Sequence, residues 1–276
     1  MTKPEIVRRS SQVSFVIRSS TFLRHSSFEL RHFNESCSFV VEPSAASPSF
    51  RTGRTRPLVV GVIASRADFD SAIRMREPPD LFELRLDRVV GVVTQLEKKL
   101  SRLRAPLIIT SRHPMEGGAN RLSPLQRRNL LTRFLSQARY IDVELRSAPH
   151  FRPLLRLARR QNVRRIISIH HLKSTPSPSR LRAQARAAKA YGADIFKVAT
   201  RTDTPAQLTR LIDFVAGKKP DVAVSAMGIG KLGAASRVLL ACGGSALMYV
   251  SLGQSHIEGQ ISLGQFRAVA GAVLNR

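Results

Sequence analysis

From Pro57 onward, short apolar segments of strand length alternate with longer amphipathic segments of helix length. The apolar segments occupy residues 57–65, 81–87, 105–112, 138–145, 163–171, 193–200, 220–228 and 245–253. Each is a continuous apolar run, which is typical of parallel strands buried on both faces of a sheet. Eight such strands with helices between them, in the 220 residues from 57 to 276, have the count and size of a (β/α)8 barrel. The sequence therefore predicts an α/β protein with an eight-stranded parallel TIM barrel.

The main alternative is a doubly wound open sheet, but no G-x-G-x-x-G motif follows the first apolar segment. The predicted helices carry ordinary start and stop signals. Segment 123–138 opens with Ser123 and Pro124, an N-cap followed by proline at the first helical position. Segment 177–193 ends at Tyr191 and Gly192, a glycine stop. These signals separate the helices from the strands as a barrel requires.

Residues 1–56 differ in character from the rest of the chain. They are rich in Ser and Arg, contain few acidic residues and show no sustained periodicity. This composition fits a transit peptide or a disordered leader, and equally an upstream extension translated from a wrong start. No apolar stretch of about 7–15 residues marks a secretory signal. We expect a separate basic leader over residues 1–56 and a catalytic barrel over residues 57–276.

The net charge of +26 is compatible with anionic partners, because basic surfaces neutralise phosphates. The arginines are spread over nearly every predicted helix, however, and aromatic residues make up only 6% with no tryptophan, which disfavours a nucleic-acid surface. No apolar run approaches the ~18 residues of a membrane span. Cys37 and Cys242 form no C-x-x-C pair, which suits a reducing, cytoplasmic compartment. We expect a small anionic substrate and neither nucleic acid nor membrane as partner.

Reactive side chains cluster at the predicted carboxyl ends of the strands, where barrel active sites form. They are Glu83, Arg85, Asp87, Arg112, Glu116, His170, His171, Lys197, Arg237 and Gln260. Each also has a simpler structural explanation: Glu83 and Arg85 could form internal ion pairs, and Lys197 could extend its head to water. Their convergence at one end of a single barrel favours a reactive site.

This set of residues permits one kind of chemistry. Desolvation favours the neutral form of a lysine in an apolar interior, and neighbouring arginines add to the effect. The amine of Lys197 could then attack a ketone and form an iminium, which makes the proton on the adjacent carbon removable. His170 is placed to remove it, a role worth about 10²–10⁴-fold, and Glu116 to orient the imidazole. Arginines bind carboxylates, so we predict a ketone substrate bearing a carboxylate and hydroxyls, with no metal and no cofactor.

Six stretches, taken in order, match the motifs of one enzyme family. They are ELRLD (family pattern E-x-R-x-D), TSRHPMEGG (R-x-x-x-E-G-G), SIHHL (S-Y-H-D-F), DIFKVAT (D-I-V-K-I-A), SAMGIGKLGAASR (M-G-x-x-G-x-x-S-R) and EGQIS (P-G-Q). Over residues 57–276 the chain thus resembles the type I 3-dehydroquinate dehydratases of the shikimate pathway. The resemblance implies a lyase that converts 3-dehydroquinate to 3-dehydroshikimate through a lysine Schiff base.

The resemblance also implies a role for each matching residue. Lys197 would form the Schiff base, His170 would be the general acid and base, and Glu116 would hold His170 in position. The implied substrate-binding residues are Glu83, Arg85, Arg112, Arg237 and Gln260. A homodimer is implied as well. Biosynthesis of aromatic amino acids and breakdown of quinate use the same reaction, so both roles stay open.

Three features depart from the family pattern. His171 stands where the family has aspartate, which leaves the choice between two adjacent histidines to the alignment, and this favours His170. His256 and Glu258 replace a small residue and a proline near the closing loop, where the Glu258 carboxylate could weaken anion binding or pair with an arginine. The basic leader has no counterpart in the single-domain bacterial enzymes.

Two other functions are alternatives. A class I aldolase or a transaldolase would also use a lysine on the sixth strand, but an aldolase must bind phosphate, and no convincing glycine-rich loop follows the last two strands. A basic nucleic-acid-binding module built on a barrel is the non-enzymatic alternative.

Overall fold

The computed structural model describes residues 56–217, 221–255 and 257–273; the predicted leader, up to residue 55, lies outside this part. The strands are β1 Leu58–Ile63, β2 Leu81–Arg85, β3 Leu107–Thr110, β4 Tyr140–Glu144, β5 Arg164–His171, β6 Ile195–Arg201, β7 Ala223–Ile229 and β8 Leu247–Ser251. The α-helices are α1 Arg66–Arg74, α2 Val93–Glu97, α3 Pro124–Phe134, α4 Arg152–Arg160, α5 Pro178–Ala190, α6 Pro205–Ala216, α7 Gly233–Cys242 and α8 Leu263–Val273. Short 3₁₀ turns cover Val90–Val92, Leu100–Arg102, Pro114–Glu116 and Leu135–Gln137.

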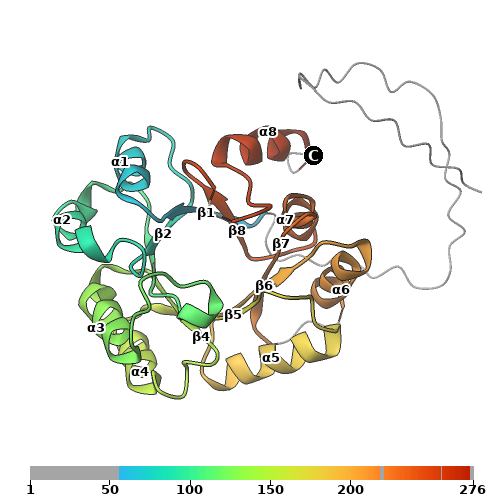
Figure 1. Cartoon of the computed structure of the whole chain (residues 1–276), viewed down its shortest axis with the longest axis horizontal. Coiled ribbons are helices and arrows are strands. Elements are labelled where there is room, and N and C mark those ends of the chain that lie inside the picture. Colours follow the sequence, from blue (N-terminus) through green and yellow to red (C-terminus); the bar gives the residue numbers. More distant parts are fainter. Residues whose placement is uncertain (1–55, 218–220, 256, 274–276) are drawn as a thin grey trace, which may run out of the picture. The chain divides into compact units, whose positions relative to one another are not determined.

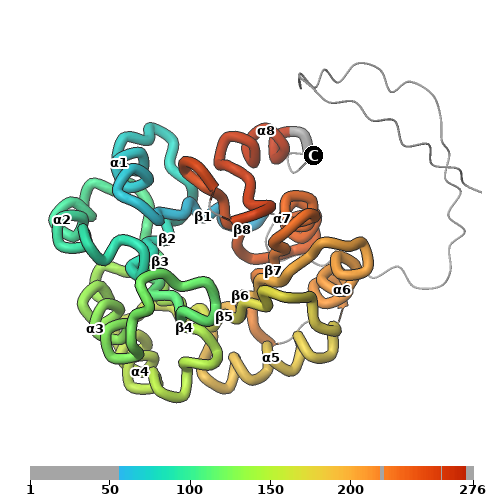
Figure 2. Tube along the Cα trace, viewed as in Figure 1, coloured from blue at the N-terminus to red at the C-terminus, as the bar shows by residue number. Residues whose placement is uncertain are grey.

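The eight strands form one parallel sheet in the order β7-β6-β5-β4-β3-β2-β1-β8. The first and last strands along the chain pair side by side, with Val60 opposite Tyr249. Between β7 and β8, the Ala246 N–H donates to the Val224 carbonyl at 2.7 Å, so the ring of strands is nearly closed. Figure 1 shows the helices outside this ring, and Figure 2 follows the chain around it from blue β1 to red β8. The predicted (β/α)8 barrel is confirmed.

Helix ends follow the signals in the sequence. The Ser123 hydroxyl accepts from the Gln126 N–H, and the Gln126 side chain accepts from the Ser123 N–H, which makes a reciprocal capping box at the start of α3. At the end of α5, Gly192 adopts φ +83°, a left-handed conformation that glycine takes without strain. The predicted helix over 123–138 is shorter, because after Phe134 the chain tightens into a 3₁₀ turn before β4.

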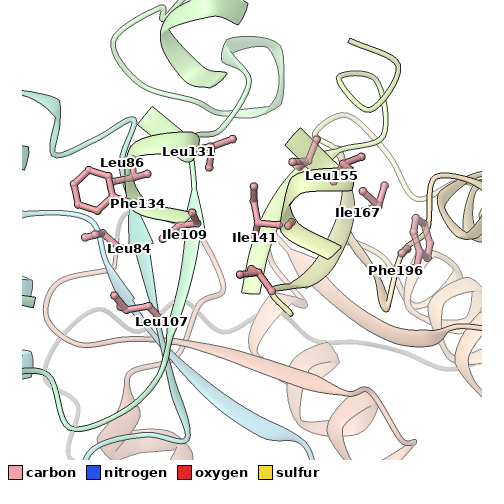
Figure 3. Packing of buried hydrophobic residues seen from close by; sticks show 14 of the residues in the cluster. Leu84, Leu86, Leu107, Ile109, Leu131, Phe134, Ile141, Leu155, Ile167 and Phe196 are labelled. Carbon is pink, nitrogen blue, oxygen red and sulfur yellow. The ribbon is translucent and has the colours of Figure 1, made fainter. Parts of the chain in front are cut away.

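Apolar side chains cover both faces of the strands, as the continuous apolar runs predict. The larger cluster fills the space between strands and helices, where Leu131 and Phe134 of α3 and Leu155 of α4 gather with strand residues (Figure 3). A second cluster lies inside the barrel and includes Val60, Ile108, Tyr140, Ile166 and Ile195. Along β3, β4 and β6 these inner residues stand two positions before Thr110, Asp142 and Lys197. An apolar layer therefore precedes the polar residues at the carboxyl ends.

Candidate active site

A cavity of about 230 Å³ lies at the carboxyl ends of the strands. All eight predicted site residues line it: Glu83, Arg85, Arg112, Glu116, His170, Lys197, Arg237 and Gln260. They come from β2, β5 and β6, from the segment after β3, from α7 and from the segment after β8. The structure thus brings these eight residues together, whereas Asp87 and His171, also singled out at the strand ends, do not line the cavity.

Lys197 lies deep in this cavity and does not extend its head to water. Its residue is 3% exposed, and its Nζ lies 3.0 Å from Asp142 Oδ2 and 3.4 Å from Glu83 Oε1. The Nζ atom also lies 3.9 Å from the centroid of the Tyr249 ring. The expected apolar surroundings are therefore wrong: two carboxylates and an aromatic face hold the amine, and each stabilises positive charge on nitrogen.

Asp142 is the centre of a buried charge network that sequence reasoning missed. It accepts two bonds from Arg112, at 3.1 and 2.9 Å, and one of 2.5 Å from the Ser168 hydroxyl. Arg112 also bonds Glu144, and Glu144 pairs with Arg127 of α3. Arg112 and Lys197 hold the pKa of Asp142 well below its usual range in spite of burial. The network fixes both the lysine and the arginine in place.

The signal for this network was present in the sequence. Asp142 and Glu144 are two residues apart in YIDVE, as Glu83 and Arg85 are in ELR, so both carboxylates face the barrel interior. Arg85 has a separate carboxylate partner, because its Nε and Nη2 donate to Asp87 at 3.0 and 2.9 Å. Asp87, singled out at the end of the second strand, is thus an orienting group rather than a ligand-facing one.

His170 and Glu116 form a hydrogen-bonded pair. His170 Nδ1 lies 3.0 Å from Glu116 Oε2, and the His170 backbone N–H donates to the same oxygen at 2.9 Å. The other carboxylate oxygen lies 3.3 Å from Nε of Arg146. Glu116 comes from the 3₁₀ turn Pro114–Glu116, which ends at Gly117 with φ +84°. The turn after β3 therefore carries the carboxylate to the end of β5.

The surroundings shift the pKa values of both residues in this pair. Burial and the charge of Glu144 raise the pKa of the Glu116 carboxyl to about 7, against the opposing effect of Arg112. Burial and the charges of Arg112 and Lys197 hold the pKa of His170 well below its usual value. His170 is therefore a neutral imidazole near neutral pH, the form in which a histidine can accept a proton.

The adjacent His171 lies away from this cavity. Its Nε2 is 3.1 Å from Gln184 Oε1 of α5, on the outer face of the barrel. Of the two histidines in SIHH, only His170 lines the cavity. The alternation of side chains along a strand accounts for this separation.

Arg237 is a buried cation with no carboxylate partner in the part of the chain that the structure describes. It is 2% exposed and donates to the carbonyls of Gly259 at 3.2 Å and Tyr249 at 3.1 Å. Burial alone lowers its pKa to about 10. A buried guanidinium that has only neutral acceptors provides a binding position for an anion.

The segment after β8 is tied to its neighbours. Glu258 pairs with Arg201 at the end of β6, with Nη1 and Oε2 at 2.9 Å, so the carboxylate that departs from the family pattern has an arginine partner. Gly259 has φ +77°, and a Cβ there would lie 2.6 Å from Gly233 Cα. These contacts carry Gln260 to the cavity. His256 lies outside the described residues.

Other kinds of site find no support in the described ranges. No group of three or more His, Cys, Asp or Glu residues there could hold a metal ion. None of the helices described there is long and apolar enough to cross a membrane.

The fold and the cavity together define a class of protein: a (β/α)8 barrel with a buried lysine and a carboxylate-held histidine at the ends of its strands. Comparison with known proteins narrows this class. The family of type I 3-dehydroquinases matches residues 60–273. The 3-dehydroquinate dehydratase of Methanothermobacter thermautotrophicus is 30% identical over 71% of this chain and 86% of its own length. That of Dehalococcoides mccartyi is 30% identical over 76% of this chain and 92% of its own length.

A solved structure agrees with these sequence matches. The crystal structure of 3-dehydroquinate dehydratase from Geobacillus kaustophilus superposes with a TM-score of 0.70 at 25% identity, and it covers 82% of this chain and 95% of its own. The chain therefore belongs to the type I 3-dehydroquinase family.

Proposed function

We propose that this chain dehydrates 3-dehydroquinate to 3-dehydroshikimate through a Schiff base on Lys197. Membership of the dehydratase family makes it a hydro-lyase. The observation that supports the residue assignments most strongly is that the lysine, the His170–Glu116 pair and Arg237, which has no carboxylate partner among the described residues, line one cavity. An aldolase-like lyase is not favoured, because the family match covers residues 60–273.

The first stage joins Lys197 to the substrate ketone. The amine attacks the carbonyl carbon, the carbonyl oxygen leaves as water, and nitrogen keeps one hydrogen and the positive charge. An ammonium and a ketone give an iminium and one water, so no external proton is needed overall. Glu83, at 3.4 Å from Nζ, can take up a lysine proton while nitrogen attacks and return it to the departing oxygen, and Asp142, at 3.0 Å, holds Nζ in place.

The second stage eliminates the ring hydroxyl. His170 takes a proton from the carbon beside the iminium, and the electron pair moves onto nitrogen as an enamine. The enamine then expels the hydroxyl, to which His170 returns a proton, and a second water leaves. Hydrolysis of the conjugated iminium consumes one water and frees Lys197. Glu116 stabilises the transient imidazolium through the 3.0 Å contact to Nδ1.

Substrate binding follows from the unpaired donors in the cavity. Arg237 would receive the carboxylate, because it is the buried guanidinium whose described partners are all neutral. The ring hydroxyls would contact Glu83, Arg85, Arg112 and Gln260. Asp87 holds Arg85 and Asp142 holds Arg112. These ion pairs fix the direction in which the remaining N–H donors of each arginine point.

We further propose that the chain acts in the shikimate pathway as a cytoplasmic homodimer. The reaction supports the pathway, the cysteine usage supports a reducing compartment, and the resemblance supports the dimer. Light scattering on the purified protein tests the dimer, which a single monomeric mass at micromolar concentration would refute.

Borohydride trapping tests the proposed chemistry. The protein is incubated with 3-dehydroquinate, reduced, digested and mapped by mass spectrometry. We expect a ligand-sized adduct on the peptide that contains Lys197, and none in Lys197→Ala. An adduct on another lysine would overturn the assignment of the nucleophile, and the absence of an adduct in the folded protein would overturn the Schiff-base proposal.

A further inference from the structure

Within the described part of the chain, Arg88 is a cation whose guanidinium has no polar partner. It lies in the turn after β2, is partly buried, and its guanidinium forms no hydrogen bond or ion pair with any residue that the structure describes. The other partly buried arginines of the described ranges all have polar partners: Asp70 for Arg66, Tyr140 for Arg164, Asp194 for Arg165, the Asp213 carbonyl for Arg182, and Asp203 with Glu258 for Arg201. Arg88 therefore differs from residues of its own kind.

The position of Arg88 gives this difference a consequence, because it lines the same cavity as Lys197. Most of the positive charge around this cavity is matched locally. Asp87 pairs with Arg85, and Asp142 pairs with both Arg112 and Lys197. Two guanidiniums remain without a carboxylate among the described residues, Arg237 and Arg88.

A substrate with one carboxylate can satisfy only one of these two cations. We propose that Arg88 forms a second anion-binding position in the cavity, so that a ring bearing two carboxylates binds more tightly than a ring bearing one. The proposal rests on the proposed function in one respect, the assignment of the substrate carboxylate to Arg237. A cyclic dicarboxylate is therefore a competitive inhibitor of the dehydration, with one carboxylate on each guanidinium.

The local electrostatics agree with this assignment. Burial and the adjacent charge of Arg85 lower the pKa of Arg88, and Asp87 only partly offsets them. An anion bound at Arg88 would relieve this repulsion, and a guanidinium fork matches a carboxylate in shape.

A carboxylate nearby decides on which side the anion binds. Arg88 also lines a smaller adjoining hollow, and Asp68 lines that hollow as well. Asp68 Oδ2 already accepts from the Ala64 N–H at 3.0 Å and from the Ser65 hydroxyl at 2.9 Å. Asp68 has no ion-pair partner among the described residues, whereas the carboxylates of the main cavity, Glu83 and Glu116, pair with Lys197 and Arg146, so the second anion belongs in the main cavity.

The two cations approach the cavity from different parts of the barrel. Arg88 follows β2 and Arg237 lies on α7, after β7, while β1 and β8 stand between these strands around the ring. A ligand that reaches both must carry its anionic groups on different ring carbons. Two carboxylates on one carbon would not serve.

The test compares two probes, cyclohexanecarboxylate and cis-cyclohexane-1,3-dicarboxylate, by calorimetry on the full chain at one fixed ionic strength. We expect at least tenfold tighter binding of the dicarboxylate by the wild type. Arg88→Gln should reduce this preference to within twofold and change the affinity for the monocarboxylate by less than threefold. Arg88→Lys should keep part of the preference because it keeps the charge.

Arg156→Gln is the matched control, because Arg156 is an exposed arginine of α4 and the substitution removes the same charge. It should leave the preference intact. Equal affinities in the wild type, an unchanged preference in Arg88→Gln, or an equal loss in Arg156→Gln would each overturn the proposal. Calorimetry measures binding without turnover, so its outcome does not depend on the proposed dehydration. If the proposed dehydration were wrong, borohydride trapping on Lys197 would fail, and the comparison of the two probes would still test Arg88. Arg237→Gln should weaken both probes, and an unchanged monocarboxylate affinity would place the first anion elsewhere.

Discussion

Two adjacent histidines show how much one residue step changes in a strand. His170 bonds Glu116 inside the cavity, and His171 bonds Gln184 of α5 outside it. We expect His170→Ala to lower kcat by about 10²–10⁴-fold, the usual contribution of a general acid or base. His171→Ala is the matched control and should keep kcat within about threefold, because its ring bonds Gln184 of α5 and does not line the cavity. Steady-state assays measure kcat of both variants. An inactive His171→Ala together with an active His170→Ala would contradict the assignment.

The Glu116 carboxyl should set the acid side of the pH profile. Its pKa of about 7 means that it is protonated below neutral pH, where it no longer stabilises a positive imidazole. The pKa of His170 lies well below its usual value, so His170 itself stays neutral over this range. We expect kcat to fall as pH drops through about 7. Glu116→Gln should have a lower kcat that no longer decreases as the pH drops through about 7. If the decrease persisted unchanged in that variant, it would have to come from the titration of another group.

Residue patterns predicted which side chains line the cavity better than they predicted which groups contact those side chains. The eight predicted residues that line the cavity follow from strand ends and motifs, because any barrel gathers its strand ends in one place. The carboxylates around Lys197 were harder to predict, because which strands face each other across the interior depends on the stagger of the whole ring. The period of two in YIDVE places Asp142 inward, but only the structure sets its 3.0 Å contact with Nζ.

At the scale of elements, local signals determined where helices begin. Ser123 caps α3 through a reciprocal bond with Gln126. We expect Ser123→Ala to lower the free energy of unfolding by about 1 kcal/mol, because one N–H of the first turn loses its acceptor. Ser136 is an exposed serine of the 3₁₀ turn after α3, and Ser136→Ala should change stability by less than about 0.5 kcal/mol. Urea unfolding measures both, and equal effects would show that the cap contributes nothing.

The segment after β8 shows where element-level prediction stops. Its glutamine was predicted from the motif, whereas the partner of Glu258 was left open between repulsion of an anion and pairing with an arginine. Arg201 lies 57 positions earlier in the chain. The two meet at Gly230 in the turn after β7, where a Cβ would lie 2.9 Å from Arg201 Nε and whose N–H donates to the Glu258 carbonyl at 3.0 Å. Contacts of this kind depend on how separate loops meet, which no local pattern encodes.

At the scale of the whole molecule, the continuous apolar runs determined the architecture. Parallel strands that bury both faces need helices outside and packed side chains inside, and both clusters are present. The net charge alone did not indicate which kind of partner the chain binds. Most of this charge nevertheless belongs to the residues of the barrel. Eight basic and four acidic residues precede residue 56, so 22 of the 26 net positive charges belong to residues 56–276. A surface of this sign attracts an anionic substrate without contacting it.

This distribution makes the contribution of the predicted leader testable. Every strand and all eight predicted site residues lie between residues 58 and 260. We therefore expect a chain that begins at residue 56 to keep kcat/KM for 3-dehydroquinate within about twofold and to unfold at the same temperature as the full chain, since barrel, site and most of the charge are retained. The control is the same truncation in Lys197→Ala, which should stay inactive. A truncated protein that loses activity or unfolds earlier would show that residues before 56 contribute to the barrel, and would shift the proposed boundary toward the N-terminus.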